Sequence, residues 1–175
     1  MAVAEQISQV TLSSDAASIT IGSIPQTYKT LEARVVLRMD NTSFPFSTRA
    51  RMAINGSSTA SQYFHFGQEL LWNPNTMETG SVHETDLLLQ GTSSNSSANM
   101  FGYSTMTFNN YTSTSHKKGG HFNTQAYIGT GYRQQRALKA GWSWNQTAAI
   151  TSLELGIAGT NLKAGTTFTL VGIGT

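Results

Sequence analysis

Hydrophobic side chains recur at every second position in several short segments of this chain. Between residues 31 and 37, apolar side chains alternate with Glu32, Arg34 and Val36. Between residues 50 and 54 the same alternation occurs, and it ends at Asn55-Gly56, a pair that favours a tight turn. A period of two is typical of a β-strand with one buried face. Both segments are therefore predicted to be strands.

The same reasoning predicts further short strands along the chain, with Gly-, Pro- and Asn-bearing turns between them. They cover residues 18–21, 63–66, 86–90, 100–108, 122–128, 142–144, 153–157 and 168–173. Residues 67–82 show no clear period. Within that stretch, Glu69–Trp72 is compatible with one helical turn, and Trp72–Asn75 has the composition of a loop.

Strands at intervals of about ten residues, without a long helical period, are typical of an all-β protein. We expect a two-sheet antiparallel sandwich of jelly-roll type. The length of 175 residues suits one domain spanning 1–175, in which residues 1–16 form an N-terminal arm or an edge strand. No internal repeat favours a propeller or a solenoid.

The composition is unusual in its low charge. Hydrophobic residues make up 38% of the chain and charged residues only 11%, against about 25% charged residues in ordinary soluble domains. Such a surface suits a protein packed against its own copies or other proteins, because little charge keeps monomers apart. A monomeric Ser/Thr-rich β-domain is the alternative.

Charge, cysteine content and hydropathy narrow the function classes. The net charge is +2 and the basic residues are scattered, so nucleic-acid binding is not indicated. The chain has no cysteine, which excludes disulfides and thiol chemistry. No run approaches the roughly 18 apolar residues of a membrane helix, and no secretion signal is visible, so we expect a soluble protein that is not exported.

The sequence shows no recognisable catalytic, cofactor or metal site. The four histidines, His65, His83, His116 and His121, do not have the spacing of metal ligands. No serine lies in a Gly-x-Ser-x-Gly elbow, and the fragment Gly129-Thr-Gly131 lacks the helix that a phosphate loop needs. We expect no cofactor, no metal and no catalytic residue.

Four arginines are candidates for an interface. Arg34, Arg38, Arg49 and Arg51 lie on the polar faces of two predicted strands. If those strands form a hairpin, like charges come close and need an offsetting group. Glu32 would offset one arginine, and an acidic surface of a neighbouring subunit would offset the others. A solvated face, with the arginine stems lying on neighbouring side chains, is the alternative.

Four aromatic residues in or next to predicted loops form a second candidate interface: Trp72, Tyr132, Trp142 and Trp144. Aromatic side chains near loops anchor protein contacts or stack on sugars. In a sandwich they also close the end of the core. All three roles are open from the sequence.

Two segments resemble a group of small structural proteins of tailed bacteriophages. That group has a strand opening of the form Ile-Pro-x-x-Tyr-x-x-Leu, a middle Asn-Gly strand and a closing Gly-Thr-x-Phe-x-Leu-x-Gly-Ile strand. The matching positions here are Ile24-Pro25, Tyr28, Leu31, Asn55-Gly56 and Gly165–Ile173. The chain departs from the pattern at Val171, where tyrosine is more usual. The resemblance spans nearly the whole chain.

The resemblance implies a non-enzymatic virion protein. We expect a capsid decoration or cement protein on the outer capsid surface, which binds the major capsid protein and its own copies as a dimer or trimer. The alternative is a tail-fibre or receptor-binding module that recognises host-surface glycans through its tryptophans. A glycan-cleaving enzyme is a third hypothesis, which requires two of four acids in one cleft: Glu69, Glu78, Glu84 and Asp86.

Overall fold

The computed structural model of the chain describes residues 3–40, 49–59, 61–71, 76–84, 87–127, 135–156 and 160–174. Side chains are described for these residues except 69–71, 76–84, 88, 127 and 135. Within these ranges the chain forms strands and no helix. The strands are β1 (Ala4–Thr11), β2 (Ser18–Ile21), β3 (Thr30–Leu37), β4 (Ala50–Ile54), β5 (Tyr63–Leu71), β6 (Thr76–Glu84), β7 (Leu87–Leu89), β8 (Gly102–Asn109), β9 (Lys118–Tyr127), β10 (Gln135–Trp144), β11 (Leu153–Gly156) and β12 (Thr167–Ile173).

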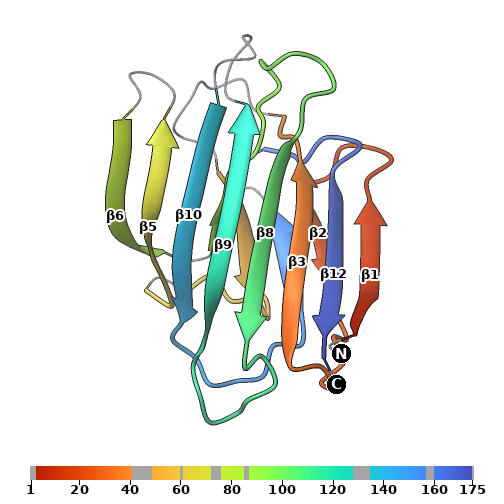
Figure 1. Cartoon of the computed structure of the whole chain (residues 1–175). Coiled ribbons are helices and arrows are strands. Elements are labelled where there is room, and N and C mark those ends of the chain that lie inside the picture. Colours follow the sequence, from red (N-terminus) through yellow and green to blue (C-terminus); the bar gives the residue numbers. More distant parts are fainter. Residues whose placement is uncertain are drawn as a thin grey trace.

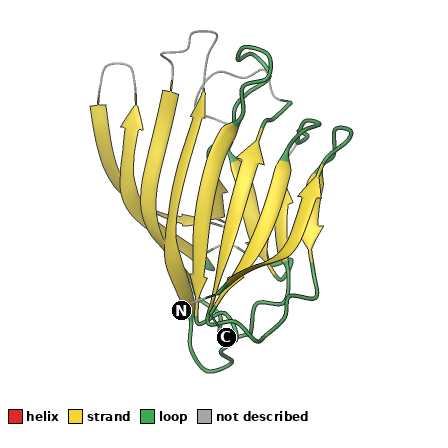
Figure 2. Ribbon diagram, turned by 45° about the vertical axis from the view of Figure 1, so that its right-hand side comes forward, coloured by secondary structure: helices red, strands yellow, loops and turns green. Residues whose placement is uncertain are grey.

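The strands form two antiparallel sheets that pack face to face, as Figures 1 and 2 show. The large sheet has eight strands in the order β1-β12-β3-β8-β9-β10-β5-β6. The small sheet has four in the order β2-β11-β4-β7. This confirms the predicted all-β, two-sheet antiparallel sandwich.

The strand pairing is nested in the manner of a jelly roll. The pairs β1·β12, β2·β11, β3·β8 and β4·β7 lie one inside the next along the chain, and they alternate between the two sheets. This is the arrangement of a long hairpin rolled into a double sheet. The remaining strands form two antiparallel pairs, β5·β6 and β9·β10, which both extend the large sheet beyond β8 (Figure 1).

The core lies between the sheets and follows from the alternation in the sequence. Leu31, Ala33, Val35 and Leu37 of β3 are all almost completely buried, whereas Arg34 and Val36 point outward. Ala50, Met52 and Ile54 of β4 face them from the small sheet with no exposure. Each fully buried side chain of the larger apolar types contributes about 1.5–3 kcal/mol, so these rows set the register of both sheets.

The first strand, β1, is an edge strand of the large sheet, paired with β12. Its register shifts between Gln6 and Ser8, which marks a bulge. Bulges are common at sheet edges, where they discourage pairing with another chain. Residues 4–11 thus take the edge-strand role, one of the two expected for the N-terminal segment.

One predicted element is wrong. Glu69 and Leu70 do not form a helical turn: they continue β5, which runs to Leu71 and pairs with both β10 and β6. The strand has hydrogen-bonded neighbours on both sides, and such a ladder overrides weak local preference. The predicted loop at Trp72–Asn75 lies outside the described residues.

Candidate functional site

The four candidate arginines do not form one cluster. Residues 31–37 and 50–54 do not form the hairpin that the sequence analysis considered, because β3 pairs with β12 and β8 in the large sheet, whereas β4 pairs with β11 and β7 in the small one. Arg34 and Arg38 therefore belong to one sheet and Arg49 and Arg51 to the other. The expected clash of like charges across a hairpin does not arise.

Arg34 stands on the outer face of the large sheet with its neighbour Glu32. The Nε atom of Arg34 donates to Oε1 of Glu32 at 2.5 Å, as the sequence analysis anticipated. This bond raises the pKa of the arginine further above its already high value. The pair neutralises its own charge, so Arg34 does not need an acidic partner on another subunit.

Arg38 organises a loop of its own chain. Its guanidinium donates to the carbonyl oxygens of Ser94, Ser96, Ser97 and Met100, at 2.8–3.2 Å. A guanidinium offers five N–H donors in a fixed fork, which suits such a set of acceptors. Arg38 is thereby engaged in holding the segment between β7 and β8 against β3.

Arg49 and Arg51 belong to the small sheet. Arg51 lies on its outer face, half-buried, across from Gly156 of β11. The next row of this face holds Ala53, Glu154 and Thr20. Arg49 is half-buried just before β4. The described side chains of this face are mostly short, and its described charges are few and of both signs.

Two of the four candidate aromatic residues are part of the core. Trp142 is 4% exposed and Trp144 is 2% exposed, both on the inner side of β10. The indole of Trp142 packs edge-on against Phe108 and donates to the carbonyl of Thr107 at 3.1 Å. Neither indole is available on the surface to bind a partner or a sugar, because alternation along β10 turns both inward. Trp72 and Tyr132 lie outside the described residues.

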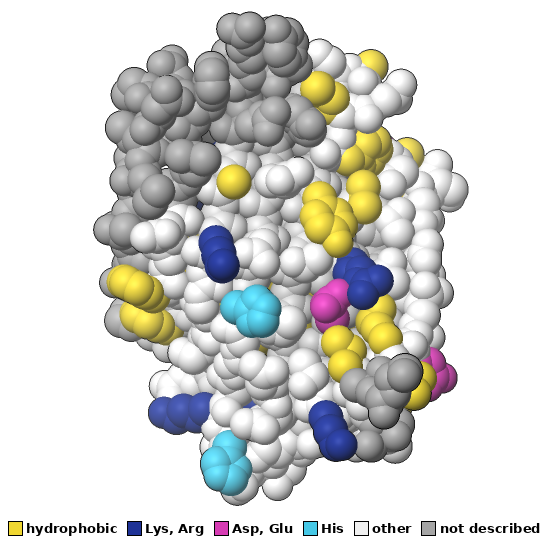
Figure 3. All heavy atoms as spheres, in the orientation of Figure 1, with side chains coloured by type: hydrophobic (Ala, Val, Ile, Leu, Met, Phe, Trp, Pro, Cys, Tyr) yellow, Lys and Arg dark blue, Asp and Glu magenta, His cyan; other side chains and the backbone are white. Residues whose placement is uncertain are grey.

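The outer face of the large sheet carries most of the exposed large hydrophobic side chains among the described residues. Phe64 and Phe66 of β5 are 37% and 61% exposed, and Tyr103 of β8 is 45% exposed. Val36 of β3 stands directly across from Tyr103. Figure 3 shows this face with hydrophobic groups on both sides of a polar centre. Clustered exposure of this kind marks a binding surface.

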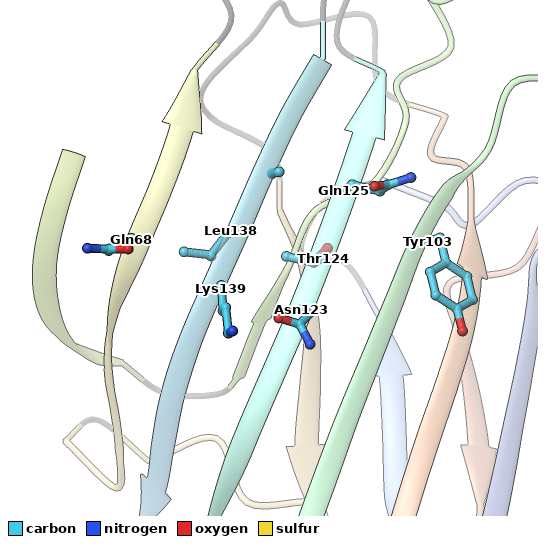
Figure 4. Close-up of a pocket in the computed structure, with 8 residues that line it drawn as sticks. Gln68, Tyr103, Asn123, Thr124, Gln125, Leu138 and Lys139 are labelled. Atoms are coloured by element: carbon cyan, nitrogen blue, oxygen red, sulfur yellow. The ribbon is translucent and has the colours of Figure 1, made fainter. Parts of the chain in front are cut away.

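A hollow with a volume of about 280 Å³ lies between these hydrophobic groups. Its floor is the backbone of β9 and β10 at Thr124 and Leu138, whose side chains turn inward. Around it stand outward-pointing side chains from four neighbouring strands (Figure 4): Gln68, Lys139, Asn123, Gln125, Ala137 and Tyr103. Ala137 is small and faces Gln125, so it leaves the space open.

The side chains around the hollow have unused hydrogen-bonding groups. Within the described part of the chain, Gln68, Asn123, Gln125 and Lys139 make no side-chain hydrogen bond, although each is exposed on the sheet. The sequence analysis missed this site. The sequence does place two amides, Asn123 and Gln125, on the same face of a predicted strand. It does not show which residues surround them, because these come from strands distant in sequence.

Lys118 is the most unusual titratable group among the described residues. It is 1% exposed, and its Nζ donates to the carbonyls of Ser113, His116 and Thr147 at 2.6–2.7 Å. Burial lowers the pKa of this ammonium. Since all three donors have acceptors, the group ties two loops together and offers nothing to a substrate.

Histidine and acidic side chains are the candidates for metal binding and for glycan cleavage, and the structure describes only some of them. The described ones contain no group of three or more His, Asp or Glu side chains placed to hold a metal ion. His116 contacts the hydroxyls of Ser113 and Ser115, on one exposed loop. The side chains of Glu69, Glu78 and Glu84, and all of Asp86, lie outside what the structure describes.

Within the residues that the structure describes, no helix is long and apolar enough to cross a membrane.

Comparisons of the sequence with protein-family models and characterised proteins, and of the fold with solved structures, find no match.

Proposed function

We propose that this chain is a non-enzymatic structural protein of a tailed-phage virion, which decorates the outer capsid surface and helps to hold capsomers together. It would bind the major capsid protein and further copies of itself. Each bound copy would bury surface area across the boundary between capsid subunits. Because it would bind the assembled shell and not the separate subunits, binding would shift the equilibrium toward the assembled shell.

The observation that carries the proposal is the position of the segments that resemble phage structural proteins. These segments, 18–38 and 149–173, lie at opposite ends of the sequence but form adjacent strands. β2 pairs with β11, and β3 pairs with β12. The resemblance therefore falls on strands of a jelly roll that pair with one another, and this architecture is common in viral capsid domains.

The fold supports this function by analogy alone, since jelly rolls also occur in lectin domains and fold does not determine function. The low charge, 11% of residues, adds independent support. A chain with so few charged groups is suited to permanent contact with neighbouring subunits.

The outer face of the small sheet is the surface we assign to the shell. Its described side chains next to Arg51 and Glu154 are short, so a second surface can approach the sheet closely there. Arginine is enriched in protein interfaces, and one charge of each sign fixes the register without a large net field. A standard interface of roughly 1,200–2,000 Å² would need this face and adjoining loops.

The test is a reconstitution on shells of a phage that encodes this chain, produced with its gene deleted. Purified protein should bind these shells in sedimentation, raise the temperature at which they open, and restore density over capsomer junctions in electron cryomicroscopy. Arg51→Glu should weaken binding at least tenfold, whereas Arg34→Ala, on the opposite sheet, should not. Density on the tail would contradict the capsid proposal and favour the tail-fibre alternative, whereas absence of density from the whole particle would contradict both.

A further inference from the structure

We propose that the hollow on the outer face of the large sheet binds a saccharide that carries a carboxylate. The hollow lies on the sheet opposite the one assigned to the shell, so this inference does not depend on the proposed function. A virion protein attached through the small sheet would present the hollow outward, and a protein with another function would present it as well.

The first argument is the hydrogen-bonding chemistry of the hollow. Gln68, Asn123 and Gln125 each carry a carbonyl oxygen and an NH₂ group, so each both accepts and donates. Neighbouring hydroxyls of a sugar ring also accept and donate, and one amide can bind two of them. Three amides on the two strands that flank β10, without side-chain bonds to the described part of the chain, match a ligand rich in hydroxyls.

The second argument is charge. Lys139 stands in the centre, across from Gln68 on one side and Asn123 on the other. None of the described outward side chains of β5, β8, β9 and β10 is a carboxylate. The nearest described acid on this face, Glu32, is already paired with Arg34. An ammonium without an acid beside it favours an anionic group on the ligand, through a charge-assisted bond.

The third argument is the apolar flank. Tyr103 borders the hollow, and Phe66 stands one row away, across from Gly141. The C–H faces of sugar rings are apolar and pack against exposed aromatic rings. An aromatic side chain beside a few converging polar groups is typical of ligand sites.

Gly141 adds an observation about space. A Cβ atom built there would have its nearest neighbour at 3.9 Å, so packing within the chain does not require glycine. Glycine weakens a strand interior and often marks a place where a ligand comes close to the backbone. The position lies one row beyond Lys139 on the same face of β10, between Phe66 and His121.

A protein partner fits this hollow less well. The buried centre of a protein interface is depleted in lysine, and a docked protein would have to satisfy three amides and an ammonium at once. The volume of about 280 Å³ is near the lower end of the roughly 300–1,000 Å³ of ligand pockets. It suits one sugar ring of a longer chain.

The experiment is a binding screen of the full chain against an array of oligosaccharides that end in glucuronate, galacturonate or sialate, each with a neutral counterpart. We expect saturable binding to at least one carboxylate-bearing saccharide and at least tenfold weaker binding to its neutral counterpart. The strongest binder is then titrated by calorimetry. Absence of binding to every acidic saccharide would overturn the inference, and so would equal binding to the neutral counterparts.

Variants locate the site. Lys139→Met should weaken binding at least tenfold, and Ala137→Phe, which fills the hollow, should abolish it. Arg51→Glu, on the other sheet, should leave it unchanged. Because positions 137 and 139 are exposed, both variants should fold, and their melting temperatures check this. In the shell assay, Ala137→Phe should bind shells normally. If Ala137→Phe loses shell binding, the hollow is a protein contact and the inference is overturned. If Arg51→Glu still binds shells normally, that result counts against the proposed function and not against this inference.

Discussion

The inner sides of the jelly-roll strands and of the two added hairpins differ in chemistry. Strands β3, β4 and β12 bury almost only aliphatic and aromatic side chains. The hairpin strands β5, β9 and β10 bury tryptophans together with polar and charged groups, among them His65, Lys118 and Arg136. A strand whose inner face is purely apolar has its register specified by burial alone. A strand that buries a cation also needs hydrogen-bond acceptors placed around that cation.

The outer sides differ as well. On β3 the exposed charges Glu32 and Arg34 satisfy each other. On the hairpins, the amides and the lysine around the hollow have no such side-chain partners within the described part of the chain. If the hollow binds a ligand as proposed, the hairpins would exchange some local stability for that binding, whereas the nested strands would contribute chiefly to the fold.

The largest expected effect comes from the residue that joins the two regions. Trp142→Ala removes an indole that packs on Phe108 of the jelly roll and bonds to Thr107. We expect a loss of about 3–5 kcal/mol in the free energy of unfolding, measured by urea denaturation. Trp142→Phe should lose less, because it keeps the ring contact. A loss below about 1 kcal/mol for the alanine variant would show that the hairpin is not coupled to the core.

A smaller effect is expected at the buried cation of β9. Lys118→Met leaves the carbonyls of Ser113, His116 and Thr147 without their shared donor. Unsatisfied buried groups cost about 1–3 kcal/mol each, and partial hydration of the loops should limit the loss to roughly 2–4 kcal/mol. The matched control is Lys117→Met, at the exposed neighbouring position. Equal stability of the two variants would contradict the role assigned to Lys118.

Two glycines of the hairpins should respond in opposite directions. Gly141→Ala has room and should raise the stability by about 0.5–1 kcal/mol. Gly120→Ala would place a Cβ atom 1.9 Å from the carbonyl oxygen of Thr107 and should destabilise the sheet. Thermal melts of both variants test this. If Gly141→Ala raises the melting temperature and also weakens saccharide binding, this supports the hypothesis that the hairpins give up stability for binding. A lower melting temperature of Gly141→Ala would count against that hypothesis.

The smallest effect concerns an exposed pair between loops of the jelly roll. Asp15 accepts from Lys163 Nζ at 2.6 Å and from the backbone N–H of Ala164, and these bonds lower its pKa below 3.8. The ionised group therefore stabilises the fold above pH 3.8, and this contribution is lost as the pH falls through the lower folded value. Asp15→Asn should be slightly less stable at pH 6, with a difference that narrows below pH 3.8. A constant difference across acid titration would exclude the linkage.

The sequence predicted the jelly-roll strands well and the hairpins poorly, for a physical reason. Residues 31–37 and 50–54 alternate strictly because one face is fully buried, so their pattern is visible locally. The strand β6 was missed, and β5 was taken as shorter, because Gly67 and Gly80 interrupt the pattern and pairing with distant strands decides the conformation.

Placement of the candidate residues could not be predicted in the same way. The hairpin considered for the arginines does not form, because strands that follow one another belong to different sheets in a nested order. The hollow depends on the register of four strands, with Lys139 beside Asn123 and Gln68. Such contacts follow from long-range pairing, which single-strand patterns do not specify.

The nested order also has a consequence for how the protein folds during synthesis. β1 has β12 as its neighbour in the large sheet, and Ala4 pairs with Ile173. During synthesis, at about 5–20 residues per second, β1 therefore stays without its sheet partner until β12 has been made. Contacts so distant in sequence slow folding, because the closure of a long loop precedes the gain from pairing. The bulge between Gln6 and Ser8 would protect the waiting edge from pairing with another nascent chain.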